Sequence, residues 1–400
     1  FFANFERLDR RNPVSNLATI PDAAFREGDF SASPFPVFQP GSRVPFPGNR
    51  VPVSLQDAAA RRIVSFLPAP NSPGSLDAQA NRRVNNFVNN FSNAPNTWEI
   101  TSRVDHYASS KLRMNGRFTH YRSDNPSEPI LPGPLDNSVG PGVTTGYQAS
   151  LGGTYVLSPR WLVEVNGGFL RNNPIVDPPA AGFNVQEGFG IARSVGTAPP
   201  RFNISGWALL GTNDNTYRRQ IDNNYQFSAA MGHTRGAHNL RFGFQMRKNQ
   251  HNNENRGGNW TGVYNVTGDI TNPNNTGGNS VNALADFLLG NVKTGVYALT
   301  QPMAGRRNSN YAGFLQDDWK FSRRLTLNLG LRWEYEGPMT SSNDIYSRID
   351  IVSLRLLAAN VNASRSLNLE GAKRNFAPRV GLAFSLDDKT VIRSAFGAFY

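Results

Sequence analysis

The sequence predicts an all-β fold: a transmembrane antiparallel up-and-down β-barrel with long extracellular loops and short periplasmic turns. From Trp98 onward, apolar and polar residues alternate with a period of two, which is typical of strands with one apolar and one polar face. The predicted strands of ten to thirteen residues are joined alternately by turns of three to six residues and by loops of roughly 20 to 60. Asn, Gly and Pro, which favour turns over helices, supply 45, 37 and 27 of the 400 residues.

The alternation defines five hairpins. In the first, Trp98, Ile100 and Val104 lie on one side, and Glu99 and Thr101 lie on the other. Residues 1–10 are expected to form a first barrel strand, and residues 11–97 a long extracellular loop region. The hairpins are predicted over residues 98–121, 145–171, 216–250, 311–335 and 376–400.

The unequal connections favour a barrel over a soluble sandwich, in which loops of mixed length occur at both ends. Outer-membrane barrels have short periplasmic turns, long outer loops and strands of roughly nine to eleven residues. The turns at Ser109, Pro159, Arg323 and Asp388 are therefore predicted to be periplasmic, and loops centred near 60, 133, 195, 275 and 355 extracellular. Aromatic residues near strand ends suit interfacial girdles; they are Trp98, Tyr107, Tyr121, Tyr147, Trp161, Tyr217, Trp319, Trp333 and Tyr335.

Composition excludes several classes of protein. The absence of Cys excludes a disulfide scaffold, a Cys-ligated metal centre and thiol catalysis. Wholly apolar stretches are only a few residues long, far short of the roughly 18 that a membrane-spanning helix needs. The chain lacks an initiator Met and a signal sequence, so we interpret it as an internal fragment.

Several segments resemble one known family. Residues 311–320 (YAGFLQDDWK), followed by 325–335 (LTLNLGLRWEY), closely resemble a barrel hairpin of TonB-dependent outer-membrane receptors of the Oar-like subgroup. Further matches in the same order cover essentially the whole chain: residues 1–8, 45–52 (PFPGNRVP), 103–106 (RVDH), 285–290 (ADFLLG), 375–381 (NFAPRVG) and 389–393 (KTVIR).

The resemblance implies a 22-stranded barrel, closed by an N-terminal plug, that imports ligands with energy from the inner-membrane TonB complex. The chain has about eleven predicted strands, roughly the first half of such a barrel, and it contains no plug or TonB box. Outer-membrane localisation and contact with the TonB complex through a preceding N-terminal region are thus expectations from the family.

No catalytic or cofactor site is expected, because the five His residues have no evident partners and no nucleotide-binding Gly-rich motif occurs. A metal pair at His233 and His238 is conceivable, although a solvated turn is the simpler interpretation. Asp317 and Asp318 are neighbours on a strand and point to opposite faces, so they cannot readily act on one reacting atom. We therefore expect a protein that is not an enzyme and that holds no metal or cofactor.

The polar sides of the predicted strands carry the candidate functional residues. With Glu99 included, seven Arg oppose six acidic residues, so the basic excess behind the net charge of +12 lies mostly in loops and turns. An electropositive tunnel for nucleic acid is not supported. Structural bracing of the barrel and contact with a plug or ligand remain the alternatives for the lumen-facing candidates, which are Arg103, Asp105, Arg113, Arg117, Glu164, Arg218, Asp222, Arg241, Arg247, Asp318, Arg332 and Glu334.

The loops carry two further hints. Val281, Leu284, Ala285 and Leu288 have helical spacing, which indicates a short amphipathic helix that either packs within its loop or gates a ligand. Arg residues in outer loops could pair with phosphates or carboxylates of lipopolysaccharide or of a ligand.

These observations predict an outer-membrane receptor for energised uptake of a ligand too large for porins, such as an oligosaccharide, a peptide or a metal chelate. Two alternatives stay open. The barrel could be the mount of a surface structural or adhesion protein, or the chain could be a soluble all-β glycan-binding protein.

Overall fold

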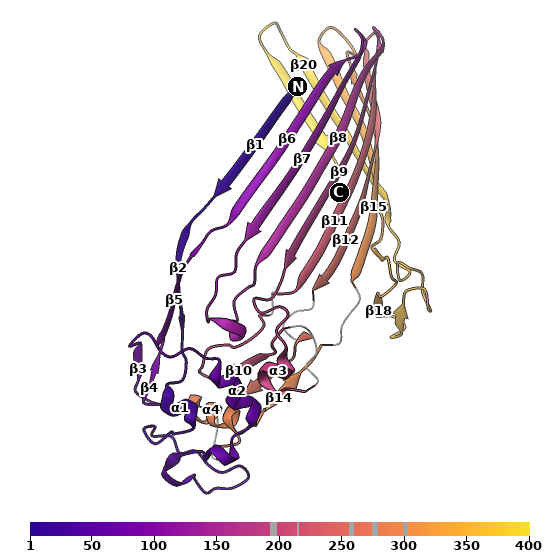
Figure 1. Ribbon diagram of the computed structural model, residues 1–400. Helices are drawn as coiled ribbons and strands as arrows, with labels where there is room; N and C mark the ends of the chain where they lie inside the picture. The colour runs from indigo at the N-terminus through magenta and orange to yellow at the C-terminus, as the bar shows by residue number, and fades with distance from the viewer. Residues whose placement is uncertain (193–197, 214–215, 256–259, 274–278, 299–302) are drawn as a thin grey trace.

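The computed structural model describes residues 1–192, 198–213, 216–255, 260–273, 279–298 and 303–400. Its main element is one large antiparallel sheet in which strands follow one another in chain order (Figure 1). A two-residue strand, β17 (Thr340–Ser341), pairs with residues 306–307 of this sheet. The eleven consecutive strands are β1 (Phe2–Asp9), β6 (Asn96–Tyr107), β7 (Leu112–Asn125), β8 (Gly142–Ser158), β9 (Trp161–Val176), β11 (Arg218–Arg235), β12 (His238–Asn255), β15 (Ala304–Trp319), β16 (Leu325–Glu336), β20 (Ala372–Ser385) and β21 (Val391–Gly397).

Strand register confirms the alternation and the up-and-down barrel topology. Leu329 of β16 lies between Asp317 and Val380 of the neighbouring strands, and the adjacent Asn328 lies between Asp318 and Gly381. Successive residues of a strand point to opposite faces, so each strand contributes to one apolar and one polar face. The apolar face leaves large side chains uncovered, including Leu151, Leu315 and Leu331, which are 73%, 52% and 45% exposed.

Several strands are longer than the alternation predicts. Strands β11 and β12 have 18 residues each, and their loop-side halves are rich in Asn. At the loop-side end of β12, beyond the predicted end at residue 250, polar residues occur on both faces, so the period-two signal is lost although backbone pairing continues from Arg218 opposite Asn255 to Arg235 opposite His238. The turn between these strands consists of Gly236 and Ala237, shorter than the three to six residues predicted for the turns, and Gly236 adopts a φ of 59°.

The short turns lie at one end of the sheet and the long loops at the other (Figure 1). The predicted loop centres near 195 and 275 lie outside the described residues. The loops contain β2 (Asn12–Ala18), α1 (Ala23–Glu27), η1 (Pro47–Asn49), η2 (Val53–Leu55), α2 (Ala58–Ser65), β3 (Ser75–Asp77), β4 (Arg82–Val84), β5 (Phe87–Asn93), η3 (Gly133–Leu135), α3 (Val185–Phe189), β10 (Arg201–Ile204), β13 (Val263–Val266), α4 (Ser280–Leu288), β14 (Thr294–Val296), β18 (Ser347–Ile349) and β19 (Leu356–Ala358). No helix in the described ranges is long and apolar enough to span a bilayer.

The hydrophobic core of the described chain lies in the loops and not in the sheet. Four loops, 10–95, 126–141, 177–217 and 256–303, share it, and we call their described residues the loop cap. Its largest fully buried side chains include Phe30, Ile63, Leu131, Phe189 and Leu284. The eleven consecutive strands contribute no residue to this core cluster. The segment 11–97, expected to be loop, is thus largely folded, and β2 and β5 extend the β1–β6 pair into it.

The aromatic prediction is only partly right. Trp98, Tyr147, Trp161, Trp319, Trp333 and Tyr335 share the apolar face, as a girdle requires. Tyr107 and Tyr121 lie on the polar face, because they have the same parity as Arg103 and Arg117 on their strands. Tyr217 precedes β11 and packs against Trp260 at 4.8 Å between ring centroids.

Candidate functional site

All twelve charged candidates lie on the polar face of the sheet. In the strand register, Arg117 lies opposite both Arg103 and Ser150, and Glu164 lies opposite Ala230. The polar face therefore continues from strand to strand. The same parity includes Arg241 and Arg247 on β12, opposite Gln316 and Asn310 of β15. The linear pattern of charges therefore becomes one continuous surface.

Ion pairs connect many of these residues. The Arg103 guanidinium donates two hydrogen bonds of 2.8 Å to the Asp105 carboxylate. Arg241 reaches across β11 to Glu164 at 2.9 Å. The Arg241–Glu164 pair braces β12 and β9 across β11, whereas Arg103 and Asp105 lie on one strand. Both pairs are partly exposed, so they contribute little to folding.

A hollow with a volume of about 680 Å³ opens on this face. Arg247, Arg332 and Glu334 line it, together with neutral side chains that include Gln226 and Asn310. Arg332 donates to Glu334 at 2.5 Å and to the Gln245 amide oxygen at 3.1 Å. Within the described ranges Arg247 forms no ion pair, so the hollow offers a guanidinium that can bind an anionic group.

The remaining candidates have local partners or none. Asp318 accepts a hydrogen bond of 2.6 Å from Asn328, and Asp222 accepts one from His251. The Arg113 guanidinium lies over the Tyr107 ring, 5.0 Å from its centroid. Neither Arg117 nor Arg218 forms an ion pair in the part of the chain that the structure describes.

Sequence reasoning missed an array of amides on the same face. Asn224 donates to Asn249, Asn249 donates to Asn308 at 2.7 Å, and Asn308 donates to Asn310 at 3.3 Å. These residues come from β11, β12 and β15. A search restricted to charged residues could not find them, but Asn at polar-face positions of three adjacent strands was a usable signal. Amides of this kind can hydrogen-bond hydroxyl-rich or amide-containing ligands.

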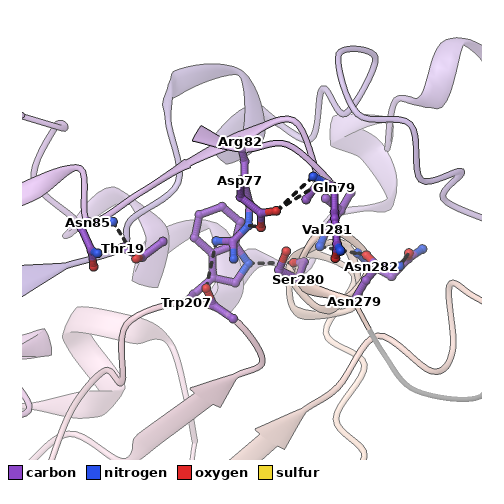
Figure 2. Close-up of polar contacts among 12 residues, drawn as sticks. Thr19, Asp77, Gln79, Arg82, Asn85, Trp207, Asn279, Ser280, Val281 and Asn282 are labelled. Carbon is purple, nitrogen blue, oxygen red and sulfur yellow. Dashed lines mark hydrogen bonds and ion pairs between the residues drawn. The ribbon is translucent and has the colours of Figure 1, made fainter. Parts of the chain in front are cut away.

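Arg82 connects different loops of the cap (Figure 2), and its side chain is only 8% exposed. Arg82 pairs with Asp77 at 3.2 Å and donates to the Gly206 carbonyl oxygen at 2.9 Å. Its guanidinium lies 4.7 Å from the centroid of the Trp207 ring, and the Trp207 indole N–H donates to the Ser280 carbonyl oxygen at 2.7 Å. Burial lowers the pKa of Arg82, and the Asp77 carboxylate opposes this shift. Three loops are thereby tied together.

Helix α4 contributes six residues to the core of the cap. Asn279 caps its first turn by accepting from the backbone N–H groups of Val281 and Asn282. Every residue from Val281 to Leu288 is buried. Asp286 accepts hydrogen bonds from the backbone N–H groups of Ile270 and Thr271, at 3.1 and 2.9 Å, and burial raises the pKa of its carboxyl. The predicted helix therefore exists and packs into the shared core.

Substitution of Arg82 by Met should loosen the junction of the cap loops. The change removes the ion pair and the hydrogen bond but keeps much of the aliphatic volume, so we expect a loss of about 1–3 kcal/mol in the free energy of cap opening. Hydrogen exchange of α4 amides measures this loss. Arg83→Met, at an exposed neighbouring position, is the control, and equal exchange in both variants would contradict the role of Arg82.

His233 and His238 do not form a shared metal site. The His233 ring stacks on Trp161, with centroids 3.9 Å apart, whereas His238 stacks on Trp319 and hydrogen-bonds Asp317 at 2.7 Å. The described residues contain no group of three or more potential metal ligands. The two His residues therefore extend the aromatic girdle beside the short turns.

The family model of the outer membrane beta barrel domain matches residues 1–400, so the chain belongs to that family. It is an outer-membrane protein, and the soluble alternative is wrong. None of the curated proteins is significantly similar to the chain.

Solved structures similar to this chain include three transporters or receptors. The copper transporter OprC is 13% identical over 76% of this chain and 36% of its own, with a TM-score of 0.41. The outer membrane transporter YddB from Escherichia coli is 12% identical over 82% and 42%, with a TM-score of 0.40. The open form of the ferric-catecholate import receptor Fiu from E. coli K12 is 10% identical over 76% and 47%, with a TM-score of 0.39. The chain spans less than half the length of each of these proteins.

Proposed function

We propose that this chain is part of an outer-membrane receptor that takes up a ligand too large for porins, using energy from the TonB complex. The main support for the proposal is the loop cap, a folded body with its own hydrophobic core at the end of a sheet that has one polar face. A passive pore needs no folded body over its mouth. A receptor does, because ordered loops present binding groups with little loss of conformational entropy.

The polar face has the chemistry to contact a plug or a passing ligand. It combines paired charges with Arg117 and Arg247, which have no ion pair among the described residues, and with the amides of Asn224, Asn249 and Asn308. In a closed barrel this face would line the lumen. Mixed charges and amides suit an oligosaccharide, a peptide or a metal chelate better than a nucleic acid, which would require a basic tunnel.

Growth tests the transport step. The complete gene is deleted and then restored with and without its TonB-box region, and growth is measured on oligosaccharides, peptides and metal chelates as nutrient sources. Energised transport predicts that only the version with the TonB box restores uptake. Full restoration by an intact barrel without that box would reject the proposal.

The alternative function is a surface mount for structural or adhesive loops. The separate hairpin of β18 and β19 favours it, because apolar residues there, including Ile351, Val352 and Leu354, are 85%, 90% and 80% exposed. A mount predicts unchanged growth on every nutrient after deletion, together with loss of cell attachment. Lipopolysaccharide is the expected neighbour of the loop Arg residues in both cases.

A further inference from the structure

Six exposed cations lie at the turn end of the sheet. We call this surface the turn rim and define it by the first four short turns and the residues that flank them. The hairpin turns lie together in Figure 1. All of the cations are exposed, and they are Lys111, Arg160, Arg235, Lys320, Arg323 and Arg324.

Charge compensation varies from place to place on the sheet. On the strands, some Arg residues pair with carboxylates, as in Arg103–Asp105, Arg122–Asp124 and Arg219–Asp177, whereas others, such as Arg117 and Arg247, have no ion pair among the described residues. None of the six rim cations has an ion pair among the described residues. The fifth turn, with Asp387, Asp388 and Lys389, carries two negative charges against one positive charge and is excluded from the rim. The rim charges thus remain available to an external anion.

Aromatic rings place the rim beside a membrane interface. Trp161 stacks on His233, and Trp319 stacks on His238 and meets Phe321 edge-on at 4.9 Å. Trp161 and Trp319 lie on the apolar face directly next to the turns, where an indole is half in hydrocarbon and half in the headgroup layer. Arg160 directly precedes Trp161 and Lys320 directly follows Trp319, so the rim cations lie next to these rings, at the depth of lipid phosphates.

We propose that the turn rim binds the headgroups of anionic phospholipids. Cations spread over four turns match a layer of many phosphates, which attracts each Lys or Arg near its surface. An acidic protein would instead require a local docking surface, and the rim is distributed over several hairpins. Assignment to the periplasmic leaflet rests on the sidedness proposed for the turns, and lipopolysaccharide would be the anion if the sidedness were reversed.

Native mass spectrometry of the full-length protein tests this proposal with phosphatidylglycerol, phosphatidylcholine and lipopolysaccharide as probes. The rim variant combines Arg160→Gln, Arg235→Gln, Arg323→Gln and Arg324→Gln. The control removes the same charge from exposed loop positions by Arg43→Gln, Arg61→Gln, Arg83→Gln and Arg355→Gln. Both are compared with the parent at equal β-sheet content, measured by circular dichroism, so that misfolding is detected separately.

We expect the parent to retain phosphatidylglycerol in preference to phosphatidylcholine. Each cation removed from the rim should lower the apparent phosphatidylglycerol affinity about fivefold, while the control keeps the parent value. Equal phosphatidylglycerol retention by the rim variant and the parent would overturn the proposal. The proposal would also be overturned if the rim variant lost lipopolysaccharide binding but kept phosphatidylglycerol binding. Energised uptake is measured separately, so the two proposals can fail independently.

Discussion

Leu329→Arg should lower the free energy of unfolding of the complete barrel by about 2–4 kcal/mol, whereas Asn328→Arg should be much better tolerated. Leu329 lies on the apolar face in the middle of β16, so an Arg there would place a charge in hydrocarbon. Asn328 lies on the polar face and already donates a hydrogen bond to Asp318, so an Arg at this position gains a carboxylate partner.

Refolding titrations of the full-length protein into bilayers measure both variants. The pair is matched, because both substitutions introduce the same side chain at adjacent residues of one strand. Equal destabilisation would contradict the assignment of the two faces. Leu329→Ala serves as a further control, because it shortens the side chain without adding charge and should cost much less than Leu329→Arg.

Leu284→Ala should destabilise the loop cap by about 2–5 kcal/mol, the range for a Leu deletion in a packed core. Leu284 is 1% exposed on α4 and belongs to the core cluster shared by four loops. Hydrogen exchange should therefore become faster in several loops together. Amides of β11 and β12 should be unaffected, because the sheet contributes nothing to this core.

Leu76→Ala is the control for this variant, because Leu76 lies in the same cap and is 55% exposed. If Leu284→Ala altered exchange only within α4, the loops would be separate bodies and not one cap. If the sheet amides also exchanged faster, the cap and the sheet would unfold as one unit.

The sheet was predictable because a bilayer-spanning strand must satisfy a simple rule. Backbone groups pair with neighbouring strands, one face meets lipid and the other meets polar surroundings, so alternation in the sequence survives. Trp98, Ile100 and Val104 follow this rule, as do Leu327, Leu329 and Leu331. The rule weakens beyond the bilayer, which is why the Asn-rich loop-side end of β12 was predicted to stop at residue 250 and not at Asn255.

The cap was not predictable in the same way. Its core unites residues far apart in the chain, such as Ile63, Leu131 and Phe202, and no local period connects them. Helix α4 was the exception, since Val281, Leu284 and Leu288 repeat at helical spacing within nine residues. The junction at Arg82 depends on three loops meeting, and such a junction leaves no trace in a single sequence.

The most direct test of the account is the sidedness of the two ends. Single Cys residues are introduced into the complete protein at exposed positions, 76 and 355 in the loops and 159 and 388 in the turns. Intact cells that carry each variant are then labelled. The chain has no native Cys, so it adds no background of its own. A membrane-impermeant thiol reagent should label positions 76 and 355 and spare 159 and 388. Labelling of the turn positions with sparing of the loop positions would contradict a cap that faces the outside of the cell.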